Sequence, residues 1–174
     1  SAAATINITV LEPMVDLLYS PDNLTLMRGT TMAPLLPSVS GGNVSEWSLV
    51  GTLPNGLSFS NGVFSGTPLV NMTQTPYLVY ANTTGGSATA WVNITVLEPA
   101  VDLLYNPYNL TLTRNVSMTP LSPTVSGGDV EVWAIEPALP LGLNFSNGVI
   151  SGTPEVNMTT TMFTVWANTS GGAA

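Results

Sequence analysis

The sequence lacks cysteine, lysine and histidine and contains few charged residues of any kind. Without cysteine the chain forms no disulfide, and without lysine it cannot form a Lys–Asn isopeptide cross-link. Arg28 and Arg114 are the only basic residues, against ten acidic ones, and the net charge is -8. Nucleic acids and anionic membrane surfaces are bound through clustered Lys and Arg. The composition therefore excludes both as partners.

The same absences argue against an enzyme. No His, Cys or Lys is available as a base, a nucleophile or a soft metal ligand. A hydrolase with paired carboxylates needs two acids that converge on a cleft, whereas the acidic residues here are scattered through expected turns and linkers. The sequence has no apolar run near the length of a membrane span. We expect no catalytic residue, no metal site, no membrane insertion and no cofactor other than covalent N-glycans.

What the sequence does contain is an internal repeat with a period of 86 residues. LEPMVDLLY at 11–19 returns as LEPAVDLLY at 97–105, and residues 13–88 match residues 99–174 at 47 of 76 positions. A fixed period of this kind indicates tandem domains. We expect residues 1–12 to be a strand that completes a neighbouring repeat, residues 13–98 a complete first repeat, and residues 99–174 a second repeat that lacks its last strand.

Short apolar alternations predict an all-β chain. Apolar residues alternate with polar ones at the positions of half-buried strands: Ile6, Ile8 and Val10; Val92, Ile94 and Val96; Leu24 and Leu26; Leu110 and Leu112; Tyr77, Val79 and Ala81; Phe163, Val165 and Ala167. Asn61-Gly62 and Asn147-Gly148 each divide an apolar run in the way of a β-hairpin turn. About seven short strands in each repeat favour a β-sandwich.

Two related strings carry a family resemblance. LPNGLSFSNGVFSGTP at 53–68 and LPLGLNFSNGVISGTP at 139–154 resemble the signature of the immunoglobulin-like repeats of microbial surface proteins, which are similar to dystroglycan-type cadherin-like domains. The resemblance covers both repeats. It implies a seven-stranded sandwich, arranged as one bead in a row of exported domains, and it implies no catalytic chemistry. The predicted fold is thus two tandem immunoglobulin-like β-sandwiches with an N-terminal donor strand.

The two repeats differ in their final strand. After Gly85-Gly86 the chain continues into a predicted strand at about 89–97, whereas the sequence ends shortly after Gly171-Gly172. Residues 3–11 have the pattern of such a final strand without a preceding sandwich. Exposing Ile6, Ile8 and Val10 beside an unpaired sheet edge favours association. We therefore expect Ile6, Ile8 and Val10 of one copy to insert into the second repeat of another copy. Such a head-to-tail contact gives a polymer of copies of the chain.

A second interpretation gives the same string of sandwiches. The 174 residues can be a segment of a longer covalent array, in which the continuing chain supplies the missing strand. A monomer with a frayed end is the third alternative.

Asparagine is concentrated in N-glycosylation motifs. Asn-x-Ser/Thr accounts for 11 of the 15 asparagines. Several of these asparagines alternate with apolar positions and should face solvent, as a bulky glycan requires. We expect N-glycans, and hence export to the cell surface or to an extracellular fibril, at sites among the following: Asn7, Asn23, Asn43, Asn71, Asn82, Asn93, Asn109, Asn115, Asn144, Asn157 and Asn168.

The tryptophans divide into two predicted groups. Trp47 and Trp133 are expected in the cores. Trp91, Tyr80 and Trp166 share the parity of sequon asparagines and should face outward, where they could contact a sugar. Glu12-Pro13 and Glu98-Pro99 mark the junctions, which the prolines should stiffen, and a calcium site there is the weaker alternative.

These observations predict a structural protein. We expect a subunit, or a two-repeat unit, of a glycosylated extracellular filament joined by β-strand complementation, with an assembly logic similar to that of donor-strand pili. The alternative functions are an adhesin or glycan-binding stalk, whose partner would be carbohydrate, and a passive cell-wall spacer.

Overall fold

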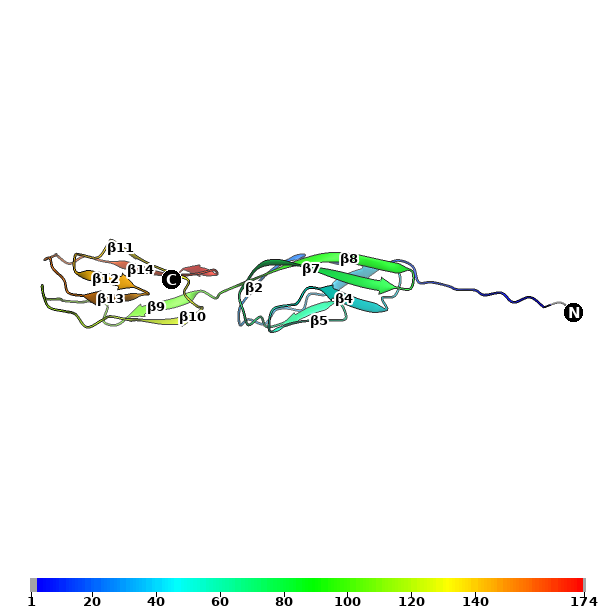
Figure 1. Ribbon diagram of the computed structural model, residues 1–174, viewed down its shortest axis with the longest axis horizontal. Helices are drawn as coiled ribbons and strands as arrows, with labels where there is room; N and C mark the ends of the chain where they lie inside the picture. Colours follow the sequence, from blue (N-terminus) through cyan, green and yellow to red (C-terminus); the bar gives the residue numbers. More distant parts are fainter. Residues whose placement is uncertain (1–2, 174) are drawn as a thin grey trace. The chain divides into compact units, whose positions relative to one another are not determined.

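The computed structural model describes residues 3–173, and every regular element in this range is a β-strand. The chain divides into unit 1, Ser1–Leu97, and unit 2, Glu98–Ala174 (Figure 1). The predicted all-β class with two sandwich repeats is confirmed. The finer boundaries predicted after residues 12 and 98 stay predictions.

Unit 1 is built on a four-stranded sheet. Its order is β2-β8-β7-β4, in which β7 pairs antiparallel with both β4 and β8, while β2 pairs parallel with β8. The four strands are β2 (Asn23–Met27), β4 (Glu46–Val50), β7 (Met72–Thr83) and β8 (Gly86–Leu97). The predicted last strand began at about residue 89; the observed strand begins at Gly86, because β7 and β8 form one long hairpin that pairs up to its turn.

The second layer of unit 1 consists of two strand pairs. β1 (Asp16–Tyr19) pairs antiparallel with β3 (Pro37–Ser40), and β5 (Leu57–Ser60) pairs antiparallel with β6 (Val63–Gly66). An isolated bridge between Leu35 and Phe64 links the two pairs.

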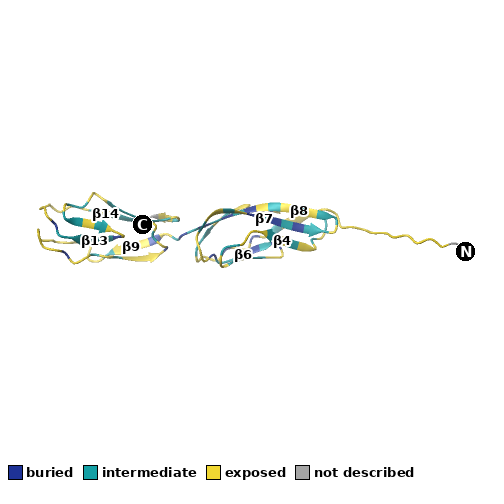
Figure 2. Ribbon diagram, in the orientation of Figure 1, coloured by how far each residue is buried: buried dark blue, intermediate teal, exposed yellow. Residues whose placement is uncertain are grey.

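The core of unit 1 lies between these layers. Alternate residues of β7 and β8 point inward, so that Val79, Val92 and Ile94 are fully buried (Figure 2). Tyr19 of β1 and Phe64 of β6 meet them from the other layer. The alternation predicted for both strands is confirmed.

The predicted Asn-Gly hairpins are confirmed in both units. Asn61 and Gly62 have φ angles of 49° and 81°, and Asn147 and Gly148 have 49° and 79°. Two successive positive φ angles are the signature of a type I′ turn, whose twist matches that of the paired strands. At Gly62 a side chain would also meet the Trp47 ring at 2.9 Å.

Unit 2 repeats most of this arrangement at the 86-residue offset. β9 pairs with β10, β12 pairs with β13, and a third sheet has the order β11-β14-β15. The bounds are β9 (Val101–Tyr105), β10 (Pro123–Gly127), β11 (Val132–Glu136), β12 (Leu143–Ser146), β13 (Val149–Gly152), β14 (Thr164–Thr169) and β15 (Gly172–Ala173).

One predicted strand is wrong, and a second is not tested by a single chain. Leu110 and Leu112 lie outside any strand, although Leu24 and Leu26 at the matching positions form β2. Residues 3–11, whose alternation resembles that of β8, also form no strand within the single chain, but they are predicted to pair in another copy, and that stays a prediction. The physical reason is the same in both cases. A β-strand forms only when it can pair with a neighbouring strand. In unit 1, β2 and β8 pair with each other, whereas within the described residues neither of these two segments has such a partner.

Candidate strand-addition site

The reference for the site is the way unit 1 holds the end of β8. Asn93 to Leu97 lie between β2 on one side and β7 on the other. The ladder continues past the strand ends, because the Asn93 N–H donates to the Asp22 carbonyl at 2.7 Å and the Arg28 N–H donates to the Leu97 carbonyl at 2.9 Å. The inward side chains Val92, Ile94 and Val96 are 0–1% exposed. This strand therefore closes one side of the sandwich.

The described residues of unit 2 place no strand at the corresponding position, which is the open side of unit 2. β14 pairs with β11 along its length, but on its other side it pairs with β15 only at Asn168 and Thr169. Among the described residues of unit 2, no strand occupies the position that Asn93–Leu97 fills in unit 1. Leu110 and Leu112 are 44% and 37% exposed there.

The apolar interior of unit 2 is less covered than that of unit 1. Tyr19, Phe64, Tyr77 and Val79 are buried in unit 1, whereas their counterparts 86 residues later are only half-buried. Those counterparts are Tyr105, Ile150, Phe163 and Val165. The difference is expected if a buried strand is needed to cover these side chains.

The chain also contains an exposed segment of matching sequence. Ile6, Ile8 and Val10 are 80%, 82% and 88% exposed. A shift of 86 residues superposes them on the buried Val92, Ile94 and Val96 of β8. Within the described chain this segment and the open side of unit 2 belong to different units.

The Glu-Pro segment that follows the exposed residues is anchored in its own unit. The Glu12 N–H donates to Thr84 Oγ1 at 2.9 Å, and Thr83 Oγ1 donates to the Pro13 carbonyl at 3.2 Å. The Asn43 N–H donates to Glu12 Oε2 at 3.4 Å. The segment is thus held by both Gly-Gly turns of unit 1, which are glycines because a side chain at Gly42 or Gly85 would overlap a carbonyl of the segment.

Unit 2 holds its own Glu-Pro segment in the same way. The Glu98 N–H donates to Ser170 Oγ at 2.9 Å, Thr169 Oγ1 donates to the Pro99 carbonyl at 3.1 Å, and the Asp129 N–H donates to Glu98 Oε2 at 3.2 Å. The sequence predicted these two junctions but not their anchoring at the Gly-Gly turns. The Glu-Pro pairs and the Gly-Gly pairs both recur after 86 residues, and this shared spacing was the signal available for the contact. Among residues 3–173, no group of three or more Asp, Glu, His or Cys side chains comes together in a way that could hold a metal ion.

The predicted glycosylation sites are distributed over both units. None of them is fully buried: Asn82, Asn93 and Asn168 are half-buried and the other eight are exposed. Two sequon asparagines that are distant in sequence become neighbours, because Asn23 pairs with Asn93 and Asn93 Nδ2 donates to Asn23 Oδ1 at 2.9 Å. Occupancy of these sites stays a prediction.

The aromatic side chains follow the predicted division with one adjustment. Trp47 packs against the core of unit 1. The rings of Trp133 and Phe145 meet edge to face, with 6.4 Å between their centroids. Both tryptophans are only half-buried. Of the three residues predicted to face outward, Trp91 is 57% exposed and Tyr80 and Trp166 are half-buried.

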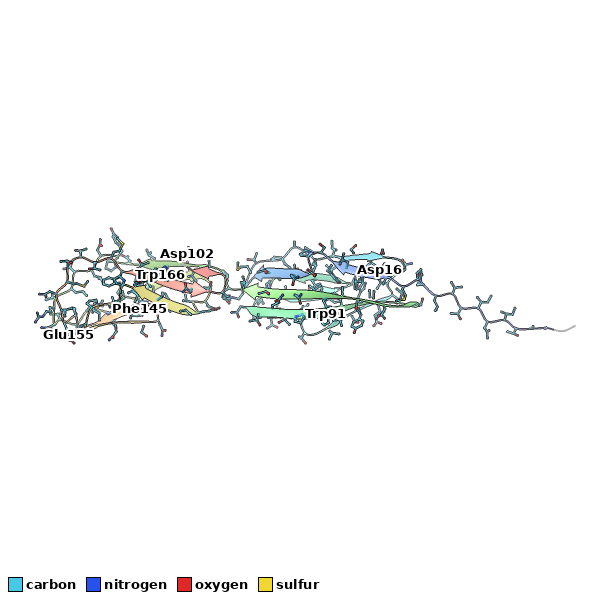
Figure 3. The ribbon with its side chains drawn as sticks, turned by 90° about the horizontal axis from the view of Figure 1, so that it is seen from above. Asp16, Trp91, Asp102, Phe145, Glu155 and Trp166 are labelled. Atoms are coloured by element: carbon cyan, nitrogen blue, oxygen red, sulfur yellow. The ribbon has the colours of Figure 1, made fainter. Side chains whose placement is uncertain are left out.

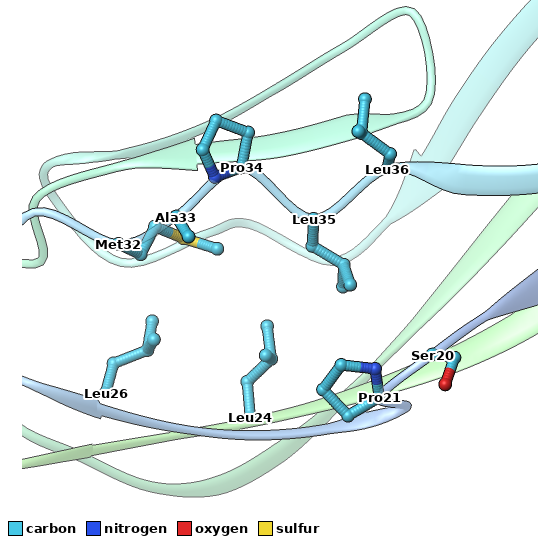
Figure 4. A pocket seen from close by; sticks show the side chains of 9 residues that line it. All are labelled: Ser20, Pro21, Leu24, Leu26, Met32, Ala33, Pro34, Leu35 and Leu36. Atoms are coloured by element: carbon cyan, nitrogen blue, oxygen red, sulfur yellow. The ribbon is translucent and has the colours of Figure 1, made fainter.

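A pocket of about 460 Å³ lies in unit 1 between β2 and the segment 32–36 (Figure 4). Leu24 and Leu26 face Met32 and Leu35 across it, and Ser20 is its one polar side chain. A pocket with this lining offers no acid, base or metal ligand. No helix that could span a membrane occurs in the described part of the chain.

The comparison with protein families decides the identity of the repeats. Residues 15–97 and residues 101–174 each match the family described as "Putative Ig domain". The chain belongs to this family. Its two units are accordingly tandem Ig-like domains, as the motif at 53–68 implied. Comparison with curated proteins gives no match.

Solved structures with similar Ig-like domains include those of Dscam proteins. The chain is similar to the N-terminal four Ig domains of Dscam1 isoform 9.44, with a TM-score of 0.55 and 11% identity over 95% of this chain and 44% of that one. It is also similar to the N-terminal eight Ig domains of Down Syndrome Cell Adhesion Molecule isoform 1.30.30, with a TM-score of 0.50 and 14% identity over 97% of this chain and 26% of that one. The chain thus spans less than half the length of either structure, and at these identities the likeness establishes the fold alone.

Proposed function

We propose that this chain is a structural subunit, or a two-repeat unit, of an extracellular filament that is assembled by β-strand complementation. Residues 3–11 of one copy add to the open side of unit 2 in another copy. The observation that carries this proposal is the match between the exposed Ile6, Ile8 and Val10 and the buried Val92, Ile94 and Val96 that close unit 1. Because the two contacting surfaces differ, the contact does not close on itself and generates a fibre.

Unit 1 supplies the register for the added strand. β2 pairs Asn23 with Asn93 and Leu26 with Val96. Shifted by 86 residues, the same register places Asn7 of the added strand beside Asn109 and Val10 beside Leu112. The added strand would pair with β14 and complete its backbone hydrogen bonds. On its other side it would pair with the segment that contains Leu110 and Leu112, which would then form a counterpart of β2.

Burial of apolar side chains provides the driving force. Burying one Ile or Val side chain stabilises by about 1.5–3 kcal/mol, so that the three inward side chains together contribute on the order of 5–9 kcal/mol before the cost of ordering the strand. The backbone hydrogen bonds of the added strand contribute in the same direction and, with this burial, oppose the entropy cost of association.

The sequons and the low charge support an extracellular location. Only 7% of the residues in the sequence are charged, and N-glycans on the exposed asparagines would supply a polar coat. The motif at 53–68 resembles that of dystroglycan-type domains, and the proposed assembly is similar in its logic to that of donor-strand pili.

Engineered disulfides test the contact and its register. The chain has no cysteine of its own, so a chain with Asn7→Cys and Asn109→Cys can cross-link only through these positions. We expect it to form a ladder of covalent oligomers on a non-reducing denaturing gel, because a disulfide needs Cα atoms within about 7 Å. The positive control is Asn23→Cys with Asn93→Cys, which tests the same pair inside unit 1.

An out-of-register pair completes the design. Asn7→Cys with Thr111→Cys lies two residues away from the expected pairing and should give only single chains. The proposal fails if the Asn7/Asn109 pair gives no ladder while the Asn23/Asn93 control closes its internal bond. Mass spectrometry of native material under denaturing conditions then separates individual subunits from a longer covalent array, and specific binding on a glycan array would instead favour the adhesin, with carbohydrate as its partner.

A further inference from the structure

Trp91 is a large apolar side chain that the fold of unit 1 leaves uncovered. It lies on the outer face of β8 (labelled in Figure 3) and is 57% exposed, whereas its neighbour Val92 is buried on the inner face. Leu78 of β7 lies directly opposite on the same face. The matching position in residues 3–11 is Thr5, so the segment that resembles the end of β8 has no aromatic ring here.

A glycosylation motif begins two residues after Trp91. Asn93-Ile94-Thr95 is a sequon, and residues two apart on a strand point to the same face at a spacing of about 6.7 Å. Asn93 is half-buried beside β2, and its Nδ2 donates one hydrogen bond to Asn23 Oδ1 at 2.9 Å. The first sugar on Asn93 would therefore lie within reach of the Trp91 ring.

The same spacing occurs twice more on the long strands. Tyr80 precedes Asn82 by two residues on β7, and Trp166 precedes Asn168 by two residues on β14. Both aromatic side chains are half-buried on the outer face. None of the other eight sequons has an aromatic residue at this spacing. The aromatic residues outside the two cores are thus concentrated beside sequons.

We propose that Asn93 is N-glycosylated and that its first sugar packs on the Trp91 ring, and that Tyr80–Asn82 and Trp166–Asn168 are sites of the same kind. An oligosaccharide is transferred from a lipid-linked phosphate donor. The bond between Nδ2 and the anomeric carbon forms, the bond from that carbon to the phosphate oxygen breaks, Nδ2 loses one proton, and the lipid phosphate leaves. Nδ2 keeps its second hydrogen, which can still donate to Asn23.

The chemistry of the contact follows from the ring. The face of an aromatic ring is apolar and carries negative potential, and one face of a hexopyranose presents C–H groups with a small positive charge. Stacking the two faces covers the indole without using the hydroxyl groups of the sugar, which stay in water. Trp91 therefore acts as a platform that orders the glycan over β8.

The sequon at Asn93 is the best of the three for a test. Thr84 and Ser170 complete the other two sequons, and their hydroxyls accept hydrogen bonds from the N–H groups of Glu12 and Glu98. Removing either hydroxyl would therefore also disturb the anchoring of a Glu-Pro segment. Thr95 lies opposite Thr25 on the outer face of the β2–β8 pair. Thr95→Val removes the sequon while keeping Asn93, its hydrogen bond and a β-branched side chain.

The experiment is a cycle of four full-length chains produced in the yeast secretory pathway. They are the parent, Trp91→Thr, Thr95→Val and the double variant, each with its high-mannose glycans trimmed enzymatically to the first N-acetylglucosamine. Glycopeptide mass spectrometry should find Asn93 occupied in the parent and in Trp91→Thr. Calorimetry should show that Trp91→Thr lowers the melting temperature of unit 1 by about 4 °C when the sugar is present and by less than about 1 °C in the Thr95→Val background.

Bacterial protein without glycans provides the matched control, in which the parent and Trp91→Thr should melt together. An unoccupied Asn93 in chains whose other sequons are occupied would overturn the proposal. Equal losses from Trp91→Thr with and without the sequon would overturn it as well, because Trp91 would then act within the protein alone.

Discussion

The substitution Ile8→Ala measures the proposed strand contact directly. Its counterpart Ile94 is 0% exposed in unit 1, whereas Ile8 is 82% exposed in the single chain. Truncating a fully buried Ile to Ala costs about 2–5 kcal/mol. Taking about 3 kcal/mol, and about 1.4 kcal/mol for each factor of ten, Ile8→Ala should weaken association between copies roughly 100-fold. The stability of a single copy should not change.

Sedimentation velocity over a concentration series of unglycosylated protein gives the association constant, and calorimetry gives the melting temperatures. Ile94→Ala is the matched control: it should lower the melting temperature of unit 1 by about 12 °C or more without the 100-fold effect on association. Thr9→Ala alters the opposite face of the same segment and should change affinity by less than about 0.5 kcal/mol. Equal effects of Thr9→Ala and Ile8→Ala, or a parent chain that stays monomeric at millimolar concentration, would refute the reasoning.

Further predictions concern the stability of the units. Tyr19 is 2% exposed and donates to the Gly62 carbonyl at 2.5 Å, so Tyr19→Phe should lower the free energy of unfolding of unit 1 by about 1–3 kcal/mol in urea titrations; an unchanged midpoint would contradict this. Burial raises the pKa of Tyr19 and of Tyr105, so the unfolded state releases these tyrosine protons at lower pH than the folded state. The contribution of these groups to the free energy of unfolding should therefore be constant below pH ~10 and fall above it. Tyr19→Phe should reduce that fall in unit 1. Gly29→Asn should be neutral within about 0.5 kcal/mol, because the φ angle is 78° with nothing near the absent Cβ and unit 2 has Asn at the matching position with a positive φ. Gly66→Asn should prevent folding of unit 1, because its side chain would overlap the backbone of the adjacent strand; a folded variant by circular dichroism would disprove this.

Local signals predicted the elements that form by themselves. The Asn-Gly turns and the alternation at Tyr77, Val79 and Ala81 specify hairpins whose partners are close in sequence, and these formed as expected. Leu110 and Leu112 have the same kind of alternation but depend on a parallel partner some 70 residues away in the unit 1 register. Sequence alternation reports which face a strand would bury and not whether its partner is present.

The candidate site was predicted in part. The alignment of residues 3–11 with the end of β8 followed from the repeat alone. That β8 is enclosed on both sides, antiparallel to β7 and parallel to β2, did not follow, because parallel pairing leaves no turn signal in the sequence. The pairing of Asn23 with Asn93 and the anchoring of Glu12 by Thr84 were unforeseen for the same reason, since both depend on contacts between distant segments.

The enclosure of β8 has a mechanical consequence for unit 1. Glu12 is anchored at the Gly-Gly turn where β8 begins, and Leu97 ends the strand, so tension between these two points runs along β8. The hydrogen bonds to β2 and β7 lie across that direction. Pulling would therefore load the hydrogen bonds of both ladders in shear, so that many of them resist the force at the same time instead of breaking one after another. A sandwich stretched in this way should yield only at high force and then rupture abruptly.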